Sequence, residues 1–535
     1  MRSQTPAAPE ATLTYHDLPR RQLVTTLAGL LVGLLLAAMD QTIVGTAMPR
    51  IVADLQGFEQ YAWVFTAYMM ASTTTAPISG KLSDLYGRKW LYLGGIVLFL
   101  VASVLCGASQ SMLQLIVFRG LQGVGGGILI ANAFTIVGDI FPPAERGKYQ
   151  GMFGAVFGLA SVIGPALGGF LTDTGSWRWA FYVNIPLGLV TLALIGRWFP
   201  HIPPRAGRRR IDWLGIGALV ACVVPLLLAL SWGGTLYPWG SPTILGLFAV
   251  AAVMLIIFLA VERVAAEPVI PLSLFRNRTF SLTILATFLT AMVMLGAGVY
   301  MPLYVQAVLG ASATESGAIL IPMMVVMVLA TATSGQIVAR WGRYRPLMLA
   351  GLAIMGVGLV LLARMGSETS RSAAVLNLVI TAVGLGTTMP LFVIVAQNAV
   401  PANVLGVVTG STQFFRQIGG TVGVALMGSA MTARFHVALG RALPPEVRAA
   451  LPDGSLDALA TPQALMNPEA AAGLRQTFAS LGPQSGALLD QTLTALRLAL
   501  AEGVHEVFLV AIAVVAAAFV ACLFLPEIPL RKTHR

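Results

Sequence analysis

The chain has 535 residues, of which 57% are hydrophobic and only 10% are charged. Soluble proteins carry about 25% charged residues, so this composition and a mean hydropathy of +0.81 exclude an ordinary soluble protein and predict one that lives in lipid. A net charge of +11 would also suit nucleic-acid binding, but the basic residues are spread over many short polar segments and form no continuous stripe. We therefore expect the lipid bilayer, and no nucleic acid, as a partner.

Runs of about twenty mostly apolar residues recur along the chain, and each is long enough to cross a hydrocarbon core of about 30 Å as a helix. The sequence predicts an all-α integral membrane protein with fourteen such helices. They are expected at residues 24–47, 61–79, 90–109, 112–138, 149–172, 179–199, 213–231, 242–262, 280–308, 316–338, 346–363, 373–398, 404–432 and 505–525. The first run carries Asp40 and lacks a small-residue cleavage site, so we expect it to remain in the protein and not to act as a signal peptide.

The cationic residues predict the orientation, because cytoplasmic loops are enriched in Lys and Arg. With the N-terminus inside, the inner segments hold 22 of these residues and the outer segments nine. We therefore expect a multi-pass protein of the cell (inner) membrane with both termini in the cytoplasm. Cys106, Cys222 and Cys522 lie in apolar runs without the spacing of a disulfide or a metal site, which predicts packing roles and no metal.

Two polar stretches read alike: GKLSDLYGRKWL at 80–91 and GQIVARWGRYRPL at 335–347. Each has two glycines seven residues apart with an arginine directly after, and each closes the second helix of a predicted group. This pattern indicates an internal duplication of the kind found in transporters, whose binding site lies at the midplane between the repeats.

The duplication predicts three parts of the chain. Residues 1–199 would form an N-terminal six-helix bundle, residues 200–279 a linker with two inserted helices, and residues 280–535 a C-terminal six-helix bundle. A long outer loop is expected at 433–503. Apolar residues at helical spacing near 484–503 leave open an amphipathic helix on the outer leaflet or a solvated loop.

Further motifs fall at the helix ends. MDQTIVGTAMP ends the first helix, LIVFRGLQGVGGG opens the fourth, GLASVIGPALGGFLTD ends the fifth, and SWRWAFYVNIPLG opens the sixth. With the GKLSDLYGRK loop, they resemble the major facilitator superfamily in its fourteen-helix drug:proton antiporter branch, and the resemblance covers nearly the whole chain. It implies the major facilitator fold and alternating access, driven by a proton gradient without a cofactor.

The loop after the second helix contains Gly80, Asp84, Gly87, Arg88 and Lys89. Gly80 allows two helices to approach closely, and Asp84 beside two cations offers a charged clasp to a neighbouring helix end. The resemblance implies a gating loop that latches the cytoplasmic side. Simple anchoring by positive charges is the alternative.

The fifth predicted helix carries Gly164, Pro165, Gly168 and Gly169. These residues make a face of small side chains and remove one backbone hydrogen bond, which allows a kink and tight packing. The resemblance implies the antiporter motif. Ordinary packing of membrane helices would explain the same pattern.

Two charges lie deep in apolar runs. Asp40 sits in the outer half of the first helix, where an ionised side chain costs about 2.5–3.5 kcal/mol, and Arg119 has a similar depth in the fourth. Charges inside membranes tend to pair, so we expect Asp40 to take up a proton from outside, with Arg119 as its counter-charge. A permanent ion pair between the two helices is the alternative.

The predicted cavity has polar and soft side chains as candidate lining: Gln122, Asn132, Tyr300, Tyr304, Gln306, Gln413 and Arg416, with Met292 and Met294. Arg416 stands apart, because an arginine near the middle of a membrane helix should face a cavity or a partner. Soft methionines and aromatic rings suit varied apolar ligands.

These features predict a proton-coupled efflux antiporter of amphipathic small molecules. No phosphate-binding loop and no catalytic constellation occurs in the sequence, so we expect neither a nucleotide-driven pump nor an enzyme. The alternatives are an exporter of a lipid, siderophore or other metabolite and a non-transporting membrane sensor. Substrate identity, oligomeric state and the use of a periplasmic adaptor stay open.

Overall fold

The structure is a computed structural model, which describes residues 19–57, 60–201, 210–311, 313–366, 369–443 and 485–530, and the single positions 447, 475, 476 and 478. Both chain ends, the basic linker up to residue 209 and most of the predicted outer loop lie outside the described residues.

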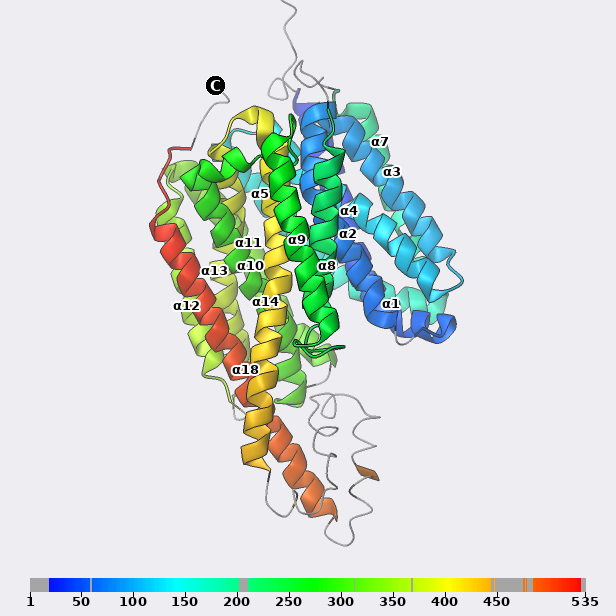
Figure 1. The fold of residues 1–535 in the computed structure, drawn as a ribbon, viewed down its shortest axis with the longest axis vertical. Helices are drawn as coiled ribbons and strands as arrows, with labels where there is room; N and C mark the ends of the chain where they lie inside the picture. The colour runs from blue at the N-terminus through cyan, green and yellow to red at the C-terminus, as the bar shows by residue number, and fades with distance from the viewer. Residues whose placement is uncertain are drawn as a thin grey trace, which may run out of the picture. The chain divides into compact units, whose positions relative to one another are not determined.

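The described chain folds into long α-helices (Figure 1). The first group is α1 (Arg20–Leu55), α2 (Tyr61–Tyr86), α3 (Arg88–Gly107), α4 (Met112–Ile140), α5 (Pro143–Thr174), α6 (Trp179–Tyr182) and α7 (Asn184–Trp198). The second group is α8 (Trp213–Trp232), α9 (Pro242–Val264), α10 (Arg278–Ala307), α11 (Ala313–Trp341), α12 (Arg345–Ala363), α13 (Arg371–Asn398), α14 (Leu405–Ala442) and α18 (Ser485–Leu523). Two short 3-10 helices, η3 (Leu272–Arg276) and η4 (Ala402–Val404), precede α10 and α14.

Within the described residues, 13 helical segments are long and apolar enough to cross a membrane. One of them, Trp179–Trp198, combines α6 and α7. The one predicted span missing from these 13, residues 61–79, corresponds to α2, which has 26 residues but is less apolar because hydroxyl side chains such as Ser72, Thr73 and Thr74 fill its middle. A helix therefore stands at every predicted position, and the all-α membrane fold is confirmed.

Polar caps explain where several helices begin. Ser111, Asp212, Ser241 and Ser370 each accept a hydrogen bond from a backbone N–H in the first turn of α4, α8, α9 and α13. Asn277 does the same for α10. Because such caps satisfy N–H groups that a helix leaves unpaired, the chain can enter each apolar run directly from a polar loop.

The helices around the predicted outer loop extend further than the sequence predicts. α14 continues to Ala442 and α18 begins at Ser485, so both helices extend into the predicted loop segment 433–503, and residues 485–503 are helical as one of the two alternatives expected. Residues 485–503 are the first half of α18, and at the end of this half Glu502 forms an ion pair of 2.8 Å with Arg434 of α14. Leu496 and Leu500 in this half are buried.

The helices form two compact units. Unit 1 contains Met1–Pro142, Ile163–Ile211 and Ala402–Gly410, and unit 2 contains Pro143–Val162, Asp212–Pro401 and Ser411–Arg535. Each unit thus includes a piece of a helix from elsewhere in the chain. The division into bundles at 1–199, 200–279 and 280–535 stays a prediction.

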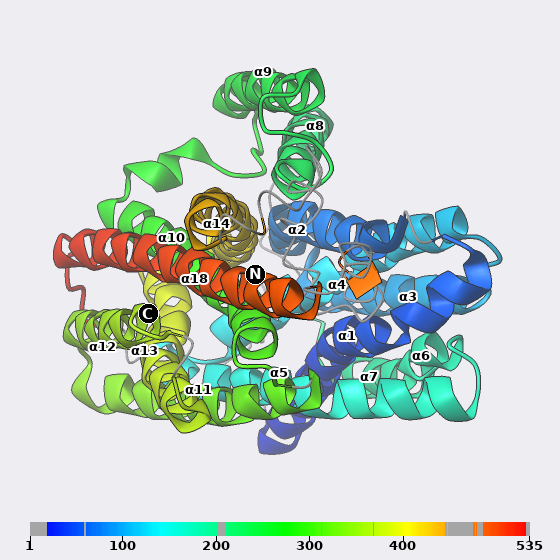
Figure 2. The ribbon, with the colours of Figure 1, turned by 90° about the horizontal axis from the view of Figure 1, so that it is seen from below.

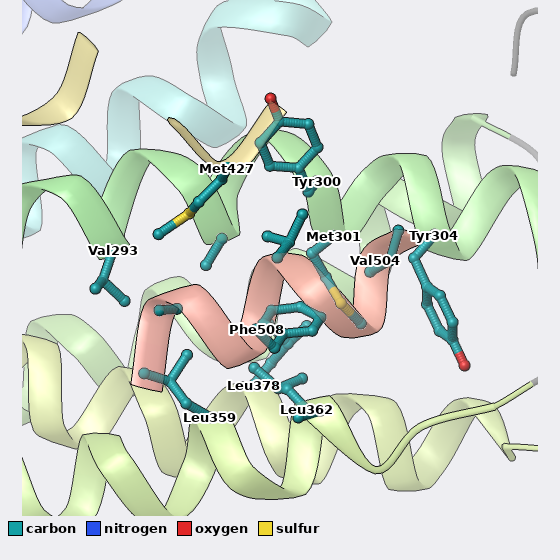
Figure 3. Packing of buried hydrophobic residues seen from close by; sticks show 14 of the residues in the cluster. Val293, Tyr300, Met301, Tyr304, Leu359, Leu362, Leu378, Met427, Val504 and Phe508 are labelled. Carbon is teal, nitrogen blue, oxygen red and sulfur yellow. The ribbon is translucent and has the colours of Figure 1, made fainter. Parts of the chain in front are cut away.

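The apolar core of unit 2 is shown in Figure 3. Side chains from α10, α12, α13, α14 and α18 meet there, including Met301, Leu359, Leu378, Met427 and Phe508. The inserted helices α8 and α9 pack against each other (Figure 2). Their other faces expose large apolar side chains, such as Leu214, Ile256 and Val264, as expected of a surface that meets lipid.

Candidate functional site

Asp40 of α1 is fully buried, with 0% of its surface exposed. Its carboxylate oxygen Oδ2 accepts a hydrogen bond from Arg119 Nη1 of α4 at 2.5 Å. The other oxygen, Oδ1, accepts from Gln122 Nε2 at 2.7 Å and from Asn184 Nδ2 of α7 at 2.8 Å. The structure thus brings together the two deep charges that the sequence singles out.

These contacts belong to a wider buried cluster, the Asp40 network, made of Asp40, Ser103, Arg119, Gln122 and Asn184. Ser103 Oγ of α3 accepts from Gln122 Nε2 at 2.7 Å and from Asn184 Nδ2 at 3.2 Å. Arg119 Nη1 also donates to Gln122 Oε1 at 2.7 Å. The network therefore ties α1, α3, α4 and α7 together around one carboxylate.

The α2 helix adds two contacts to Arg119. The guanidinium Nε donates to the carbonyl oxygen of Val64 at 3.4 Å, and its carbon lies 4.4 Å from the centre of the Tyr68 ring. A cation over an aromatic face is attracted by the ring, and more so away from water. Arg119 would thus keep acceptors if Asp40 lost its charge.

The Asp40 network is balanced only while Asp40 is ionised. One carboxylate faces one guanidinium and two amide donors, and all five side chains of the network are buried. Breaking a buried ion pair by removing one partner costs about 3–5 kcal/mol, because the other charge is left without compensation. The Asp40 carboxylate is therefore the common acceptor for three buried donors on α4 and α7.

The sequence predicts Gln122 as a cavity residue, but the structure places it in the Asp40 network. Asn184 and Ser103 were not singled out. Asn184 does lie in the SWRWAFYVNIPLG motif. Its amide side chain within an apolar run is the feature of the sequence that could have identified it as a buried polar residue.

A second charged cluster lies where α2 ends. Asp84 accepts hydrogen bonds from the backbone N–H groups of Gly406 at 3.0 Å and Val407 at 2.9 Å, in the first turn of α14. Arg88 forms ion pairs with Asp84 at 2.5 Å and with Asp139 of α4 at 2.7 Å. A carboxylate at a helix N-terminus satisfies unpaired N–H groups and the positive end of the helix dipole. We call Asp84, Arg88 and Asp139 with this first turn the clasp.

The glycines of the loop motif make the clasp possible. A Cβ atom on Gly80 would lie 2.2 Å from the carbonyl oxygen of Gly406, so the two backbones touch and no side chain fits. Gly87 has φ of 93°, a conformation that side chains rarely adopt, and it separates α2 from α3. Lys89 lies outside the clasp and donates to the carbonyl oxygen of Gly196 in α7 at 2.8 Å.

The matching stretch in the second half has the same backbone geometry. Gly335 of α11 touches the backbone of Gly147 in the second turn of α5, where an added Cβ would lie 2.3 Å from the Gly147 carbonyl carbon. Gly342, like Gly87, has a positive φ, of 68°, and separates two helices. Ala339 stands four residues after Gly335, where the first stretch has Asp84, so only the first half carries the carboxylate of the clasp.

The glycine motif of α5 packs on α1 close to Asp40. Added Cβ atoms on Gly164 and Gly168 would lie 1.8 Å and 2.1 Å from the hydroxyl oxygens of Thr42 and Thr46. Gly169 has open space around it, and Pro165 is exposed. Half of the predicted motif therefore makes the close contact between α5 and α1.

The remaining cavity candidates divide into two groups. Tyr300 and Tyr304 are buried, and their hydroxyls donate to the carbonyl oxygens of Val424 and Gly366, each at 2.8 Å. They lie in the apolar core of unit 2 (Figure 3), so they have structural contacts. Gln306 is partly buried near the end of α10.

Three candidates keep unused polar atoms within the described part of the chain. Asn132 donates to its own helix, but its Oδ1 has no hydrogen-bond partner. Gln413 is buried, and neither atom of its amide is paired. Arg416, on the same helix, makes no ion pair with any described carboxylate. These residues retain the capacity to bind a ligand.

Comparisons with known proteins agree with this architecture. Residues 30–424 match the Major Facilitator Superfamily. The chain is 40% identical over 524 residues to the multidrug transporter protein MdtP of Bacillus subtilis (strain 168), covering 96% of this chain and 94% of the relative. It is 39% identical over 505 residues to multidrug resistance protein 3 of the same organism, covering 94% and 95%.

A solved structure gives the same fold. The proton:xylose symporter XylE superposes with a TM-score of 0.60 over 95% of this chain and 96% of its own, at 12% sequence identity. At this identity the similarity shows the fold alone. The fold and the sequence match together show that this multi-pass membrane protein belongs to the Major Facilitator Superfamily of transporters.

Proposed function

We propose that the chain is a proton-coupled antiporter that exports amphipathic small molecules. As a member of its family it is a transporter and not an enzyme, and it needs no cofactor. Two relatives at 39–40% identity carry names that describe multidrug transport or resistance, which supports small substrates of varied structure.

The observation that carries the proposal is the burial of Asp40 with Arg119, Gln122 and Asn184 around it. An ionisable side chain inside the membrane is costly and marks a functional position. Neutralising Asp40 removes the charge attraction that holds Arg119 of α4 beside α1. Proton binding and helix movement are therefore linked, which a coupled transporter requires.

In the proposed cycle, Asp40 takes a proton from the outer side when the Asp40 network opens. The proton leaves toward the cytoplasm when the ion pair between Arg119 and Asp40 forms again. The clasp acts as the gate, because Asp84 holds the first turn of α14 only while the end of α2 lies beside it. We place both chain termini and the clasp on the cytoplasmic side of the cell membrane, following the distribution of Lys and Arg.

The driving force is sufficient for export. One proton that crosses 100 mV releases about 2.3 kcal/mol. Each tenfold concentration ratio costs about 1.36 kcal/mol, so one proton supports about a fifty-fold gradient of a neutral substrate.

The experiment is transport by the purified full chain in liposomes with an imposed pH gradient. The probes are three permanently charged or neutral dyes: a quaternary ammonium, an uncharged dye and a sulfonate. We expect at least one dye to accumulate on the acidic side and to be released when an ionophore collapses the gradient. Movement that ignores the gradient contradicts proton coupling, and movement of none of the dyes favours lipid or metabolite export.

A further inference from the structure

Arg416 occupies an unusual place on α14. It is eleven residues beyond Leu405, or about 16 Å along the axis at 1.5 Å per residue. This is close to the middle of a hydrocarbon core of about 30 Å. The helix belongs to a segment that is apolar enough to span the membrane, and the Arg416 side chain is only partly exposed.

Among the residues that the structure describes, no carboxylate, hydrogen-bond acceptor or aromatic face accompanies this guanidinium. The contrast with Arg119 is direct, because Arg119 has a carboxylate, an amide oxygen, a carbonyl oxygen and a tyrosine ring around it. Charged side chains inside membranes pair with one another or mark the path of a substrate. Because Arg416 has no partner among the described residues, it fits the second case.

Gln413 supplies an independent observation. It lies one turn before Arg416, on the same face of the helix, and only 1% of its surface is exposed. Neither Nε2 nor Oε1 of its amide has a hydrogen-bond partner in the described structure. A buried polar group left unpaired costs about 1–3 kcal/mol, so two unsatisfied side chains on one face indicate a ligand that would satisfy both.

We propose that Arg416 and Gln413 recognise the carboxylate of an amphipathic monoanion. The planar guanidinium can donate two parallel hydrogen bonds to the two oxygens of a carboxylate. The Gln413 amide can donate a further bond to the same group through Nε2.

This inference rests on the proposed function, because it assigns the chemical class of the cargo. The test is equilibrium binding to the purified full chain in detergent, which needs no proton gradient. The probes share one aromatic body and differ in charge: pyrenebutyrate, pyrenebutanamide and a pyrenebutyl trimethylammonium. We expect pyrenebutyrate to bind about tenfold more tightly than the amide, since a hydrogen bond to a charged group contributes about 1.5–3 kcal/mol.

Two variants test the residues. Arg416→Gln should weaken pyrenebutyrate about tenfold and leave the amide unchanged. Gln413→Leu should weaken pyrenebutyrate by a smaller factor. Arg441→Gln, which removes an exposed charge from the last turn of the same helix, is the matched control and should change nothing. If Arg416→Gln does not fold, Arg416→Lys keeps the charge and loses the planar fork, and several-fold weaker carboxylate binding supports the proposal.

Three results would overturn the inference: equal binding of the three probes, tighter binding of the cation, or a carboxylate preference that survives both Arg416 variants. The proposed function fails separately. If a pH gradient drives the quaternary ammonium dye in liposomes while Arg416 shows no carboxylate preference, antiport stands and the anion site is rejected. If pyrenebutyrate binds through Arg416 but no dye responds to the gradient, the site stands and proton coupling is rejected.

Discussion

The amide nitrogen of Asn184 on α7 lies 2.8 Å from the carboxylate of Asp40 on α1, although 144 residues separate them along the chain. The amide oxygen of Asn184 is buried and has no hydrogen-bond partner in the described structure. The Asn184 side chain therefore acts as a hydrogen-bond donor in this network. The carboxylate that accepts its shorter hydrogen bond loses its charge in the proposed cycle.

We expect Asn184→Ala to lower the free energy of unfolding by about 1.5–3 kcal/mol, the range for a hydrogen bond to a charged group. Asn377→Ala is the control, because Asn377 donates to the neutral carbonyl of Leu361 at 3.2 Å and should cost about 0.5–1.5 kcal/mol. Thermal unfolding of the purified variants measures both. Equal losses would mean that the charge on Asp40 adds nothing to the Asn184 contact.

Asp40→Asn separates coupling from a permanent ion pair. Arg119 keeps Gln122, Val64 and the Tyr68 ring as partners, so we expect the variant to fold. It should still exchange substrate down a gradient and lose accumulation driven by a pH gradient. The measurement compares exchange and accumulation in the same liposomes. Loss of folding and of both movements together would instead identify a purely structural pair.

Asp84→Asn should reduce transport far more than membrane expression, because the clasp acts in the cycle more than in folding. The control is Asp54→Asn. Asp54 is half-exposed, accepts from Trp177 Nε1 at 2.8 Å and pairs with Arg178 at 3.1 Å, and surface pairs contribute about 0–1 kcal/mol. Normal transport by Asp84→Asn in a coupled assay would leave only an anchoring role for this loop.

The α5 motif predicts opposite effects for neighbouring glycines. Gly164→Ala and Gly168→Ala place a methyl group against Thr42 and Thr46, which should destabilise the protein by about 1–3 kcal/mol. Gly169→Ala meets open space and should fold and transport as the parent does. Thermal unfolding and dye efflux report on both, and a damaging Gly169→Ala would show that the motif acts through something other than this packing.

Cysteine labelling tests the orientation. Gln110 and His201 are exposed beyond opposite helix ends, and the three native cysteines are buried, so background labelling should be low. A membrane-impermeant thiol reagent should reach a cysteine at Gln110 from outside the cell and one at His201 only after the membrane is opened. Labelling of both cysteines from the same side would contradict the predicted orientation. It would also contradict the inference that Asp40 and Arg119 lie in the outer half of the membrane.

The helices could be predicted from the sequence because an apolar run of sufficient length is a local property. Their ends could not, since α14 and α18 continue beyond their predicted bounds through contacts with each other, such as Arg434 with Glu502. Charged residues in apolar runs are rare, so Asp40, Arg119 and Arg416 could be identified directly.

Neutral polar residues carry a weaker signal. Many hydroxyls in these helices, such as that of Thr283, bond only to their own backbone, and sequence alone does not separate them from Ser103. Tyr300 and Tyr304 show a related difficulty, because the sequence does not give the rotation of a helix about its axis. An aromatic residue in a span can face a cavity or the core, and only the packing around α10 places these two in the core.

The pairing of α14 with α18 also has a practical use in imaging. A membrane protein of 56.3 kDa offers few landmarks for aligning single particles in electron micrographs. The ends of these helices at Ala442 and Ser485 are joined by the chain between them, and Arg434, Glu502 and the contact of Gly503 with Met431 hold the pair together. A small rigid protein fused between the two ends would be held by two helices at once, and would serve as a fiducial mark.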